Sequence, residues 1–399
     1  MGELAINGGS PIRKIFLPFH KPTLGAEEEE EIVKTLRSGW LTRGPKTERF
    51  ERMFAEYCKA KHAIGLNSCT AALHLSLVAL DIEKGDEVIT TPMTFVATAN
   101  AIVMVGAKPV FVDVEPETLN IDVTQIEEKI TPRTRAILPV HYIGQPCEMD
   151  PILNLANKHN LAVIEDAAHA IESVYQSKKI GSIGDFTAFS FYATKNITTG
   201  EGGMLTTKDD ALSEKARILS LHGISEDAWK RYTPEGYAHY DALYLGYKYN
   251  MTDLQASLGI HQLPKIEQFW RRRKEIVEAY NQAFKGMQEI APLQQIPKDG
   301  CKNAYHLYVI RVNTEYLKVD RDQILNALQR ENIGVGVHYR AVHLHPYYQE
   351  TLGFKKGDFP NAEYASERVI SLPLYPALSD EDVEDVIEAV EKIVTHYRK

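Results

Sequence analysis

The sequence predicts an α/β protein with a large, mostly parallel sheet covered by helices and a smaller α+β domain after it. Between residues 60 and 210, short apolar runs alternate with helical patterns, which is typical of parallel strands buried between two helix layers. Towards the carboxyl end the pattern changes to mixed strands and helices. A length of 399 residues is enough for about two domains. We therefore expect a three-layer large domain followed by a smaller one.

The elements of the large domain can be placed in chain order. Apolar runs predict strands at 62–66, 86–90, 109–113, 136–140, 161–165, 186–191 and 203–207. Helical patterns lie at 69–80, at 96–105 and around 152–158. Residues 253–284 have the pattern of one long helix, which Pro264 should kink or interrupt because proline lacks the N–H donor.

The carboxyl-terminal elements complete the predicted organisation. Strands are expected at 305–312 and 334–339, and helices at 322–330, 361–370 and 380–397. The long helix is a suitable bridge between the two parts. We therefore predict an N-terminal arm at 1–20, a large domain at 21–260 and a small domain at 261–399.

Composition and charge exclude several classes of protein. A net charge of -9 argues against general binding to nucleic acids or to anionic membrane surfaces. No segment is long and apolar enough to span a bilayer, and the first 15 residues lack the apolar core of a secretory signal. The four cysteines are scattered, with no pair at metal-ligand spacing. We expect reduced thiols, a cytoplasmic location and no metal site.

Ser68, Cys69 and Thr70 form a candidate phosphate loop between a predicted strand and a buried helix. Free backbone N–H groups at a helix N-terminus suit a phosphate dianion, and small hydroxylated side chains let it approach. Taken alone, the segment is more often a simple N-cap of a core helix.

Asp166, Ala168 and His169 directly follow an apolar run that ends at the predicted edge of the sheet. A carboxylate there can pair with a protonated ring nitrogen, while Ala168 lies flat against the ring and His169 bonds a ring oxygen. The alternative is that Asp166 caps the next turn and His169 is a core histidine with satisfied hydrogen bonds.

Lys195 is flanked by apolar and small residues, and Ser190 precedes it by five positions. Desolvation disfavours the ammonium form, which makes such a lysine a usable amine nucleophile. Its alternative is a solvated loop position. Phe95 follows another predicted strand and can either stack on a flat cofactor or pack in the core.

The joint pattern is more specific than any of its parts. A phosphate loop, a stacking aromatic, a strand-end aspartate and a lysine occur in that order, each near the end of a predicted strand, where open α/β sheets bind ligands. Pyridoxal phosphate requires an amine for its Schiff base, an acid partner for its ring nitrogen and a phosphate cradle. The sequence therefore predicts a pyridoxal-phosphate enzyme with Lys195 at its centre.

The chain resembles the DegT/DnrJ/EryC1/StrS sugar aminotransferases. These are a branch of the fold type I pyridoxal-phosphate enzymes, which have the aspartate aminotransferase-like fold. The resemblance covers nearly the whole chain and rests on the segments 38–45, 67–73, 92–97, 113–116, 165–170, 190–203, 246–253 and 337–339. It implies that Lys195 forms the Schiff base and acts as general acid and base, and that Asp166 keeps the ring nitrogen protonated.

The resemblance also implies the remaining cofactor contacts. Phe95 and Ala168 would sandwich the ring, His169 would lie near the ring hydroxyl, and Ser190 would bind the phosphate together with the loop at 68–70. Lys248 departs from the asparagine that many relatives carry where a neighbouring subunit reaches the phosphate, and Asn250 lies in the same stretch. A homodimer with shared active sites is implied.

The implied reaction moves an amino group from L-glutamate, through pyridoxamine phosphate with release of 2-oxoglutarate, to a keto group at C4 or C3 of a nucleotide-linked deoxysugar. Such reactions supply amino sugars for surface polysaccharides or other glycans. The candidate contacts for this substrate are Arg43, His338, Tyr339 and Arg340. They can equally be structural or part of a solvated basic patch.

Several related functions compete with this one. Sugar 3-dehydratases of the same fold carry histidine in place of the lysine, so Lys195 argues against that activity. An aminotransferase acting on a cyclitol or an aminohydroxybenzoate precursor remains open. So does a non-enzymatic regulator that binds pyridoxal phosphate, because a fold alone does not establish activity.

Overall fold

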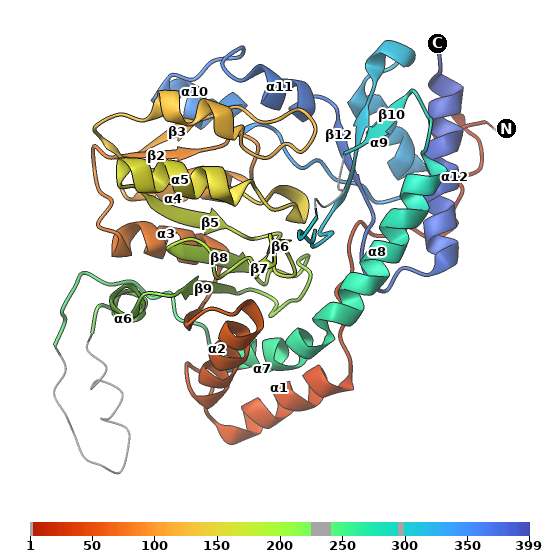
Figure 1. Ribbon diagram of the computed structural model, residues 1–399. Coiled ribbons are helices and arrows are strands. Elements are labelled where there is room, and N and C mark those ends of the chain that lie inside the picture. The colour runs from red at the N-terminus through yellow and green to blue at the C-terminus, as the bar shows by residue number, and fades with distance from the viewer. Residues whose placement is uncertain (1–2, 225–240, 294–298) are drawn as a thin grey trace.

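The computed structural model describes residues 3–224, 241–293 and 299–399. Its largest element is a seven-stranded sheet with the order β1-β9-β8-β5-β4-β2-β3 (Figure 1). The strands are β1 (His62–Leu66), β2 (Glu87–Thr90), β3 (Lys108–Phe111), β4 (Thr134–Ile137), β5 (Ala162–Asp166), β8 (Phe186–Ser190) and β9 (Gly203–Thr207). Only β9 runs against the others, pairing antiparallel with both β1 and β8. The predicted α/β class is confirmed.

The sheet is buried on both faces because successive side chains of each strand point to opposite sides. Val163 and Met204 pack into one core with α2 (Pro45–Cys58), α5 (Met149–His159) and α7 (Asp253–Gln262). Their neighbours Ile164 and Leu205 belong to a second core with α3 (Cys69–Ala79), α4 (Val96–Met104) and α6 (Asp210–Leu219). The unbroken apolar runs of the sequence therefore reflect two cores with one sheet between them.

The predicted helix at 253–284 consists of α7 and α8 (Ile266–Ala283), separated by a 3-10 turn at Leu263–Lys265 that contains Pro264. Figure 1 shows α8 running from the large sheet to a smaller one. That second sheet has the order β10-β11-β12, with β10 (Ile290–Pro292), β11 (Tyr308–Val312) and β12 (Val369–Leu372). It packs with α8, α9 (Arg321–Arg330) and α12 (Asp380–Tyr397) into a separate apolar core.

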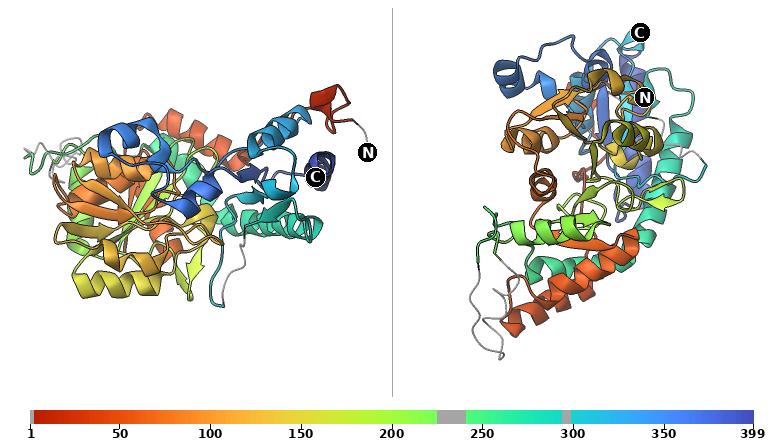
Figure 2. Two further views of the ribbon diagram at one scale, coloured as in Figure 1. Left: turned by 90° about the horizontal axis from the view of Figure 1, so that it is seen from above. Right: turned by 60° about the vertical axis from the view of Figure 1, so that its left-hand side comes forward.

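The amino-terminal segment belongs spatially to this second core. Leu4 and Leu17 are buried in it, and Arg13 forms an ion pair with Asp382 of α12 at 2.8 Å. Figures 1 and 2 show the N-terminus beside α12 accordingly. Within the described residues, no helix has the length and apolar character needed to cross a membrane. The predicted domain limits stay a prediction.

Three predicted elements near the carboxyl end are wrong in part. Residues 334–339 form no strand and make only an isolated bridge between Gly336 and Ser371. Gly334 instead donates its backbone N–H to the carbonyl of Leu17 at 2.8 Å, so this segment divides its backbone bonds between two partners. The helix expected at 361–370 is α11 (Pro360–Ser366), and its last predicted residues begin β12 instead. The strand expected from residue 305 starts at Tyr308, since Tyr305 has a positive φ of 49° that a strand does not permit.

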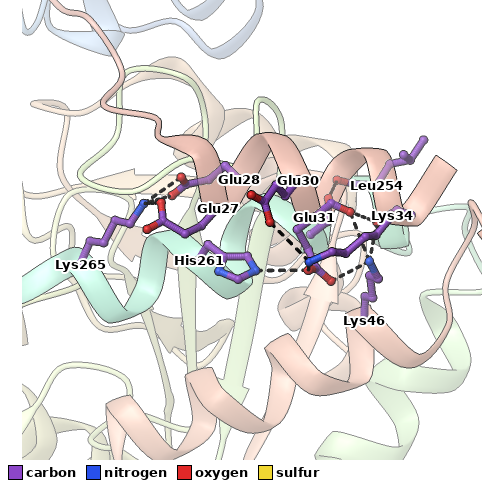
Figure 3. A network of polar contacts seen from close by, with 11 residues as sticks. Glu27, Glu28, Glu30, Glu31, Lys34, Lys46, Leu254, His261 and Lys265 are labelled. Carbon is purple, nitrogen blue, oxygen red and sulfur yellow. Dashed lines mark hydrogen bonds and ion pairs between the residues drawn. The ribbon is translucent and has the colours of Figure 1, made fainter. Parts of the chain in front are cut away.

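Helix α1 (Ala26–Ser38) is held against α7, the 3-10 turn at Leu263–Lys265 and α2 by the polar network in Figure 3. Glu28 is fully buried and accepts hydrogen bonds from Lys265 at 2.8 Å and from Gln262 at 2.8 Å. Burial raises the pKa of Glu28, but the hydrogen bonds outweigh it, so the pKa is lowered overall. Its stabilising contribution is therefore present above its unfolded-state pKa and is lost as the pH falls through the folded-state pKa.

Replacing Glu28 with alanine should lower the free energy of unfolding by about 2 kcal/mol, because Lys265 and Gln262 lose a shared buried acceptor. Glu30→Ala on the same helix is the matched control. The Glu30 side chain is 70% exposed and lies 3.7 Å from Lys34, so its loss should change stability by less than about 0.5 kcal/mol. Denaturant unfolding measures both variants, and equal losses would show that Glu28 has no special role in holding α1.

Candidate active site

A cavity of about 480 Å³ lies where several strands of the large sheet end. Its walls come from the N-terminus of α3, the start of α4, the end of β5, the segment after β8 and residues 338–339. The predicted residues that line it are Ser68, Cys69, Thr70, Phe95, Asp166, Ala168, His169, Ser190, Lys195, His338 and Tyr339. The structure therefore brings together candidates that are as much as 271 residues apart in the chain (339 minus 68).

One end of the cavity is formed by the start of α3. Ser68 is the N-cap, and its hydroxyl accepts a hydrogen bond from the backbone N–H of Ala71 at 3.0 Å. Gly203 of β9 packs directly beneath this turn, where a Cβ would lie 2.4 Å from the carbonyl carbon of Ser68. Only glycine leaves room there. The capped turn thus presents the positive end of the α3 dipole to the cavity, with Thr70 and Ser190 on its walls.

Asp166 is the last residue of β5 and is almost completely buried. One carboxylate oxygen accepts from the hydroxyl of Thr98 at 2.7 Å, and the other accepts from the backbone N–H of Ala168 at 3.1 Å. Burial raises the pKa of Asp166, while these hydrogen bonds and the charge of Lys195 oppose the rise. The carboxylate is therefore fixed in orientation, and a cation that binds beside it stabilises its charged form.

Lys195 follows β8 in a turn closed by its own N–H, which donates to the carbonyl of Tyr192 at 2.9 Å. Burial lowers the pKa of Lys195 to about 8, against the opposing influence of Cys69 and Asp166. Roughly one-tenth of the molecules then carry the neutral amine at pH 7, against less than about one-thousandth for a lysine of ordinary pKa. Such an amine can attack a carbonyl group and can carry protons over a short distance.

His169 has one ring nitrogen engaged and one available. Its Nε2 lies 3.0 Å from the hydroxyl of Tyr339, whereas Nδ1 is buried and has no hydrogen-bond partner among the described residues. Burial lowers the pKa of His169 well below its usual value, so the ring is neutral. Phe95 is 58% exposed and lies with its ring 6.1 Å from that of Tyr339, at the mouth of the cavity.

Four predicted residues lie outside this cavity. Arg43 lines a different cavity of about 730 Å³ and approaches Glu51 at 3.6 Å. Arg340 is exposed, and its guanidinium donates to the backbone of Leu344 at 2.9 Å. Lys248 is exposed, and the buried Asn250 donates to the carbonyl of Met251 at 3.1 Å. The sequence around these four residues has no feature that would have distinguished them from the predicted residues that do line the cavity.

The site also contains residues that were not predicted from the sequence. Thr98 of α4 holds Asp166 and is itself bonded at 2.8 Å to Thr94, which precedes the helix. His306 contacts His169, with ring centroids 4.2 Å apart and the ring planes tilted by 33°. It comes from a segment with no regular structure, so no sequence pattern pointed to it.

Comparison with known proteins gives consistent matches over the whole chain. The model of the DegT/DnrJ/EryC1/StrS aminotransferase family matches residues 22–391. The spore coat polysaccharide biosynthesis protein SpsC of Bacillus subtilis is 52% identical over 96% of this chain and 98% of its own. Spr1654 from Streptococcus pneumoniae, solved in its PLP form, is 37% identical with a TM-score of 0.89, over 96% of this chain and 99% of its own. DesI, solved in the presence of its TDP-sugar product, is 28% identical with a TM-score of 0.86, over 98% and 96%.

The lowered pKa of Lys195 can be tested by trace labelling with a small aldehyde and a reductant, followed by peptide mass spectrometry. The protein is first dialysed against hydroxylamine to free the amine. Labelling of Lys195 should rise with pH and be half-maximal near its pKa of about 8, because only the neutral amine reacts. Ordinary lysines titrate near about 10.4, so their labelling should still be rising there. If Lys195 followed the ordinary lysines, its amine would be solvated rather than buried.

Proposed function

This chain belongs to the DegT/DnrJ/EryC1/StrS aminotransferase family, and we propose that it moves an amino group from L-glutamate to a keto carbon of a nucleotide-linked deoxysugar, with pyridoxal phosphate as cofactor. One observation carries the proposal. The half-buried Lys195, whose amine has a pKa lowered by desolvation, and the buried carboxylate of Asp166 line one cavity, and a capped helix N-terminus forms one end of it.

The cavity contains each of the chemical groups that pyridoxal phosphate requires. Lys195 is the amine for its aldehyde, Asp166 is the acid partner for its ring nitrogen, and the start of α3 with Ser190 suits its phosphate. The unpartnered Nδ1 of His169, buried among the described residues, is a hydrogen-bonding group that the protein itself leaves unsatisfied. When bound, the cofactor supplies an electron-withdrawing ring that makes the α-proton of an amino acid acidic.

Lys195 and Asp166 have different roles in the proposed reaction. Neutral Lys195 accepts the α-proton of the amino donor and later returns it to another carbon, which needs a pKa close to the working pH; its pKa of about 8 meets that need. Asp166 keeps its negative charge when it faces a cation, because an opposite charge lowers a carboxyl pKa. Thr98 and the N–H of Ala168 hold the carboxylate in place meanwhile.

The keto sugar is proposed from the relatives and from the mouth of the cavity. SpsC is named for spore coat polysaccharide biosynthesis, and DesI was solved with a TDP-sugar product. His338 and Tyr339 line the cavity and can contact the sugar. Arg340 directly follows them but lies outside the cavity, and Arg43 lines a different cavity, so neither supports a sugar contact within one chain. We place the amination at C4 or C3, and the reaction in the cytoplasm on account of the four free cysteines.

We further propose that the active enzyme is a homodimer with shared sites. Among the described residues lining the cavity, Lys195 is the only lysine or arginine. A phosphate dianion at the start of α3 therefore meets hydroxyls and backbone N–H groups but no cationic side chain. Lys248 is exposed and Asn250 has an unpartnered side-chain oxygen within the described structure, so the same segment of a second copy is the source that we propose.

Amination of a panel of nucleotide-linked 4-keto and 3-keto deoxysugars tests the proposed reaction. With L-glutamate as donor, at least one sugar should yield an amino sugar and an equal amount of 2-oxoglutarate by mass spectrometry. The visible absorbance of the purified protein should fall with L-glutamate and return with that sugar. Keto-cyclitols and aminohydroxybenzoate precursors belong in the same panel. If only these compounds were aminated, the substrate would not be a nucleotide-linked sugar. Colour without a response to any amino donor would support a binding protein.

Two aspartate variants serve as the matched pair in that assay. Asp166→Asn should reduce kcat at least about 100-fold, because a neutral amide does not stabilise a protonated ring. Asp185 lies at the opposite end of the same strands, where it accepts from the backbone N–H of Val163 at 2.8 Å. Asp185→Asn should therefore leave turnover unchanged. If kcat fell by a similar factor in both variants, the loss caused by Asp166→Asn would reflect damage to the fold and not a role in the reaction.

The shared site can be tested with mixed dimers of two defective copies. One copy carries Lys195→Ala, and the other carries Lys248→Ala together with Asn250→Ala. If the second copy supplies these groups, a mixed dimer contains one intact site, and co-expressed, doubly tagged protein should regain activity that both parents lack. Recovery would be absent if all of these residues acted within one chain. Full activity of the Lys248/Asn250 variant alone would remove both residues from the phosphate site.

A further inference from the structure

Lys195 lines a second and much smaller cavity as well as the large one. This cavity has a volume of about 10 Å³, which is close to the space that one water molecule needs. Its walls include Arg273 of α8 and the side of Asn196, next to Lys195. The amino-terminal segment contributes His20, Thr23 and Lys21, which is exposed. Lys195 therefore lies between the proposed cofactor cavity and a second, small pocket with several polar walls.

Arg273 brings unsatisfied donors to this pocket. Its side chain is 1% exposed, and Nη1 donates to the backbone carbonyls of Leu374 at 2.8 Å and His306 at 3.3 Å. Nε and Nη2 are buried and have no partner within the described residues. Burial lowers the pKa of Arg273 to about 10, with Glu172 opposing the shift, so the guanidinium keeps its charge at neutral pH. Leaving its N–H groups unbonded would carry a large desolvation penalty.

His20 brings an unsatisfied acceptor to the same pocket. Its ring makes a hydrogen bond to the backbone of Ala193 that raises its pKa, as a carbonyl acceptor does. Because Nε2 is buried without a partner among the described residues, that bond belongs to Nδ1, which must carry the hydrogen. Burial and the charges of Arg273 and Lys195 lower the pKa of His20 to about 3, so the ring is neutral. Its Nε2 therefore presents a lone pair.

The donors of Arg273 and the acceptor of His20 together require a ligand that can both accept and donate hydrogen bonds. An anion would satisfy the donors of Arg273 but would be repelled by the lone pair of His20, and a cation would meet the reverse conflict. We propose that a single water molecule occupies this cavity, accepting a hydrogen bond from Arg273 and donating one to Nε2 of His20. The hydroxyl of Thr23, also buried and unpartnered in the described structure, is a third partner within the same walls.

The position of the water gives it a role towards Lys195. If the proposed function is correct, the amine of Lys195 is released from the cofactor in each half-reaction and must then find a hydrogen-bond partner. Lys195 lines both cavities, so the water is the partner that this pocket provides. Arg273 and His20 act through it as positioning residues, because they hold the water without touching a substrate.

Crystal structures of the holoenzyme and of two His20 variants test the water site. Wild type should show one oxygen peak bonded to Arg273 and His20. His20→Gln keeps an acceptor near the position of Nε2 and should retain the peak, whereas His20→Phe removes the acceptor and should lose it. No peak in wild type, or a peak that persists with phenylalanine, would overturn the site. An anomalous peak after bromide soaking would show an anion instead.

The role towards Lys195 is tested separately with crystals soaked in L-glutamate. After the amine is released, Nζ should lie about 3 Å from the water oxygen. Release of Lys195 with its amine turned away from the water would disprove the positioning role. If L-glutamate released no amine at all, the proposed transamination would fail while the water site of the holoenzyme would stand, so the two failures are distinguishable.

Discussion

The burial of the Lys195 amine beside the Asp166 carboxylate is the constraint on which the rest of the site depends. Removing these groups from water disfavours the charged form of each, which lowers the pKa of Lys195 and raises that of Asp166. Each therefore needs the other charge or a well-placed hydrogen bond. Because β5 and β8 are neighbours in register, with Asp166 opposite Ala188, the sheet delivers both groups to one edge.

The reversed strand β9 explains how the phosphate end comes to the same edge. Gly203, its first residue, pairs with Leu66 at the end of β1 and with Ser190 at the end of β8. The same glycine lies against the backbone of Ser68. One residue without a side chain thus joins the ends of two strands to the start of α3. A larger residue there would displace the turn that presents the helix N-terminus.

Much of this arrangement could be predicted from the sequence, because it depends on local patterns. The apolar runs marked the strands of the large sheet, and the strand-end positions of Asp166 and Lys195 follow from the general site of ligand binding in such sheets. Arg273 could not be predicted in this way. It lies in a run of basic residues at 271–274, which is typical of a solvated helix face, yet it is buried by segments about 100 residues later in the chain. His306 and His20 likewise owe their positions to long-range packing.

The residue after Lys195 anchors the backbone beside the proposed catalytic amine. The side-chain amide of Asn196 donates to both oxygens of buried Glu172, at 2.9 and 2.8 Å, and its oxygen lies 2.8 Å from Nδ1 of His306. If the amide of Asn196 were flipped, its oxygen would face the carboxylate oxygens of Glu172. The amide oxygen therefore faces His306 and accepts a hydrogen bond, so Nδ1 of His306 carries the hydrogen. Burial raises the pKa of Glu172 to about 7, against the hydrogen bonds from Asn196. The backbone next to Lys195 is therefore anchored by buried groups of the protein itself, and the proposed release of the amine requires movement of the side chain alone.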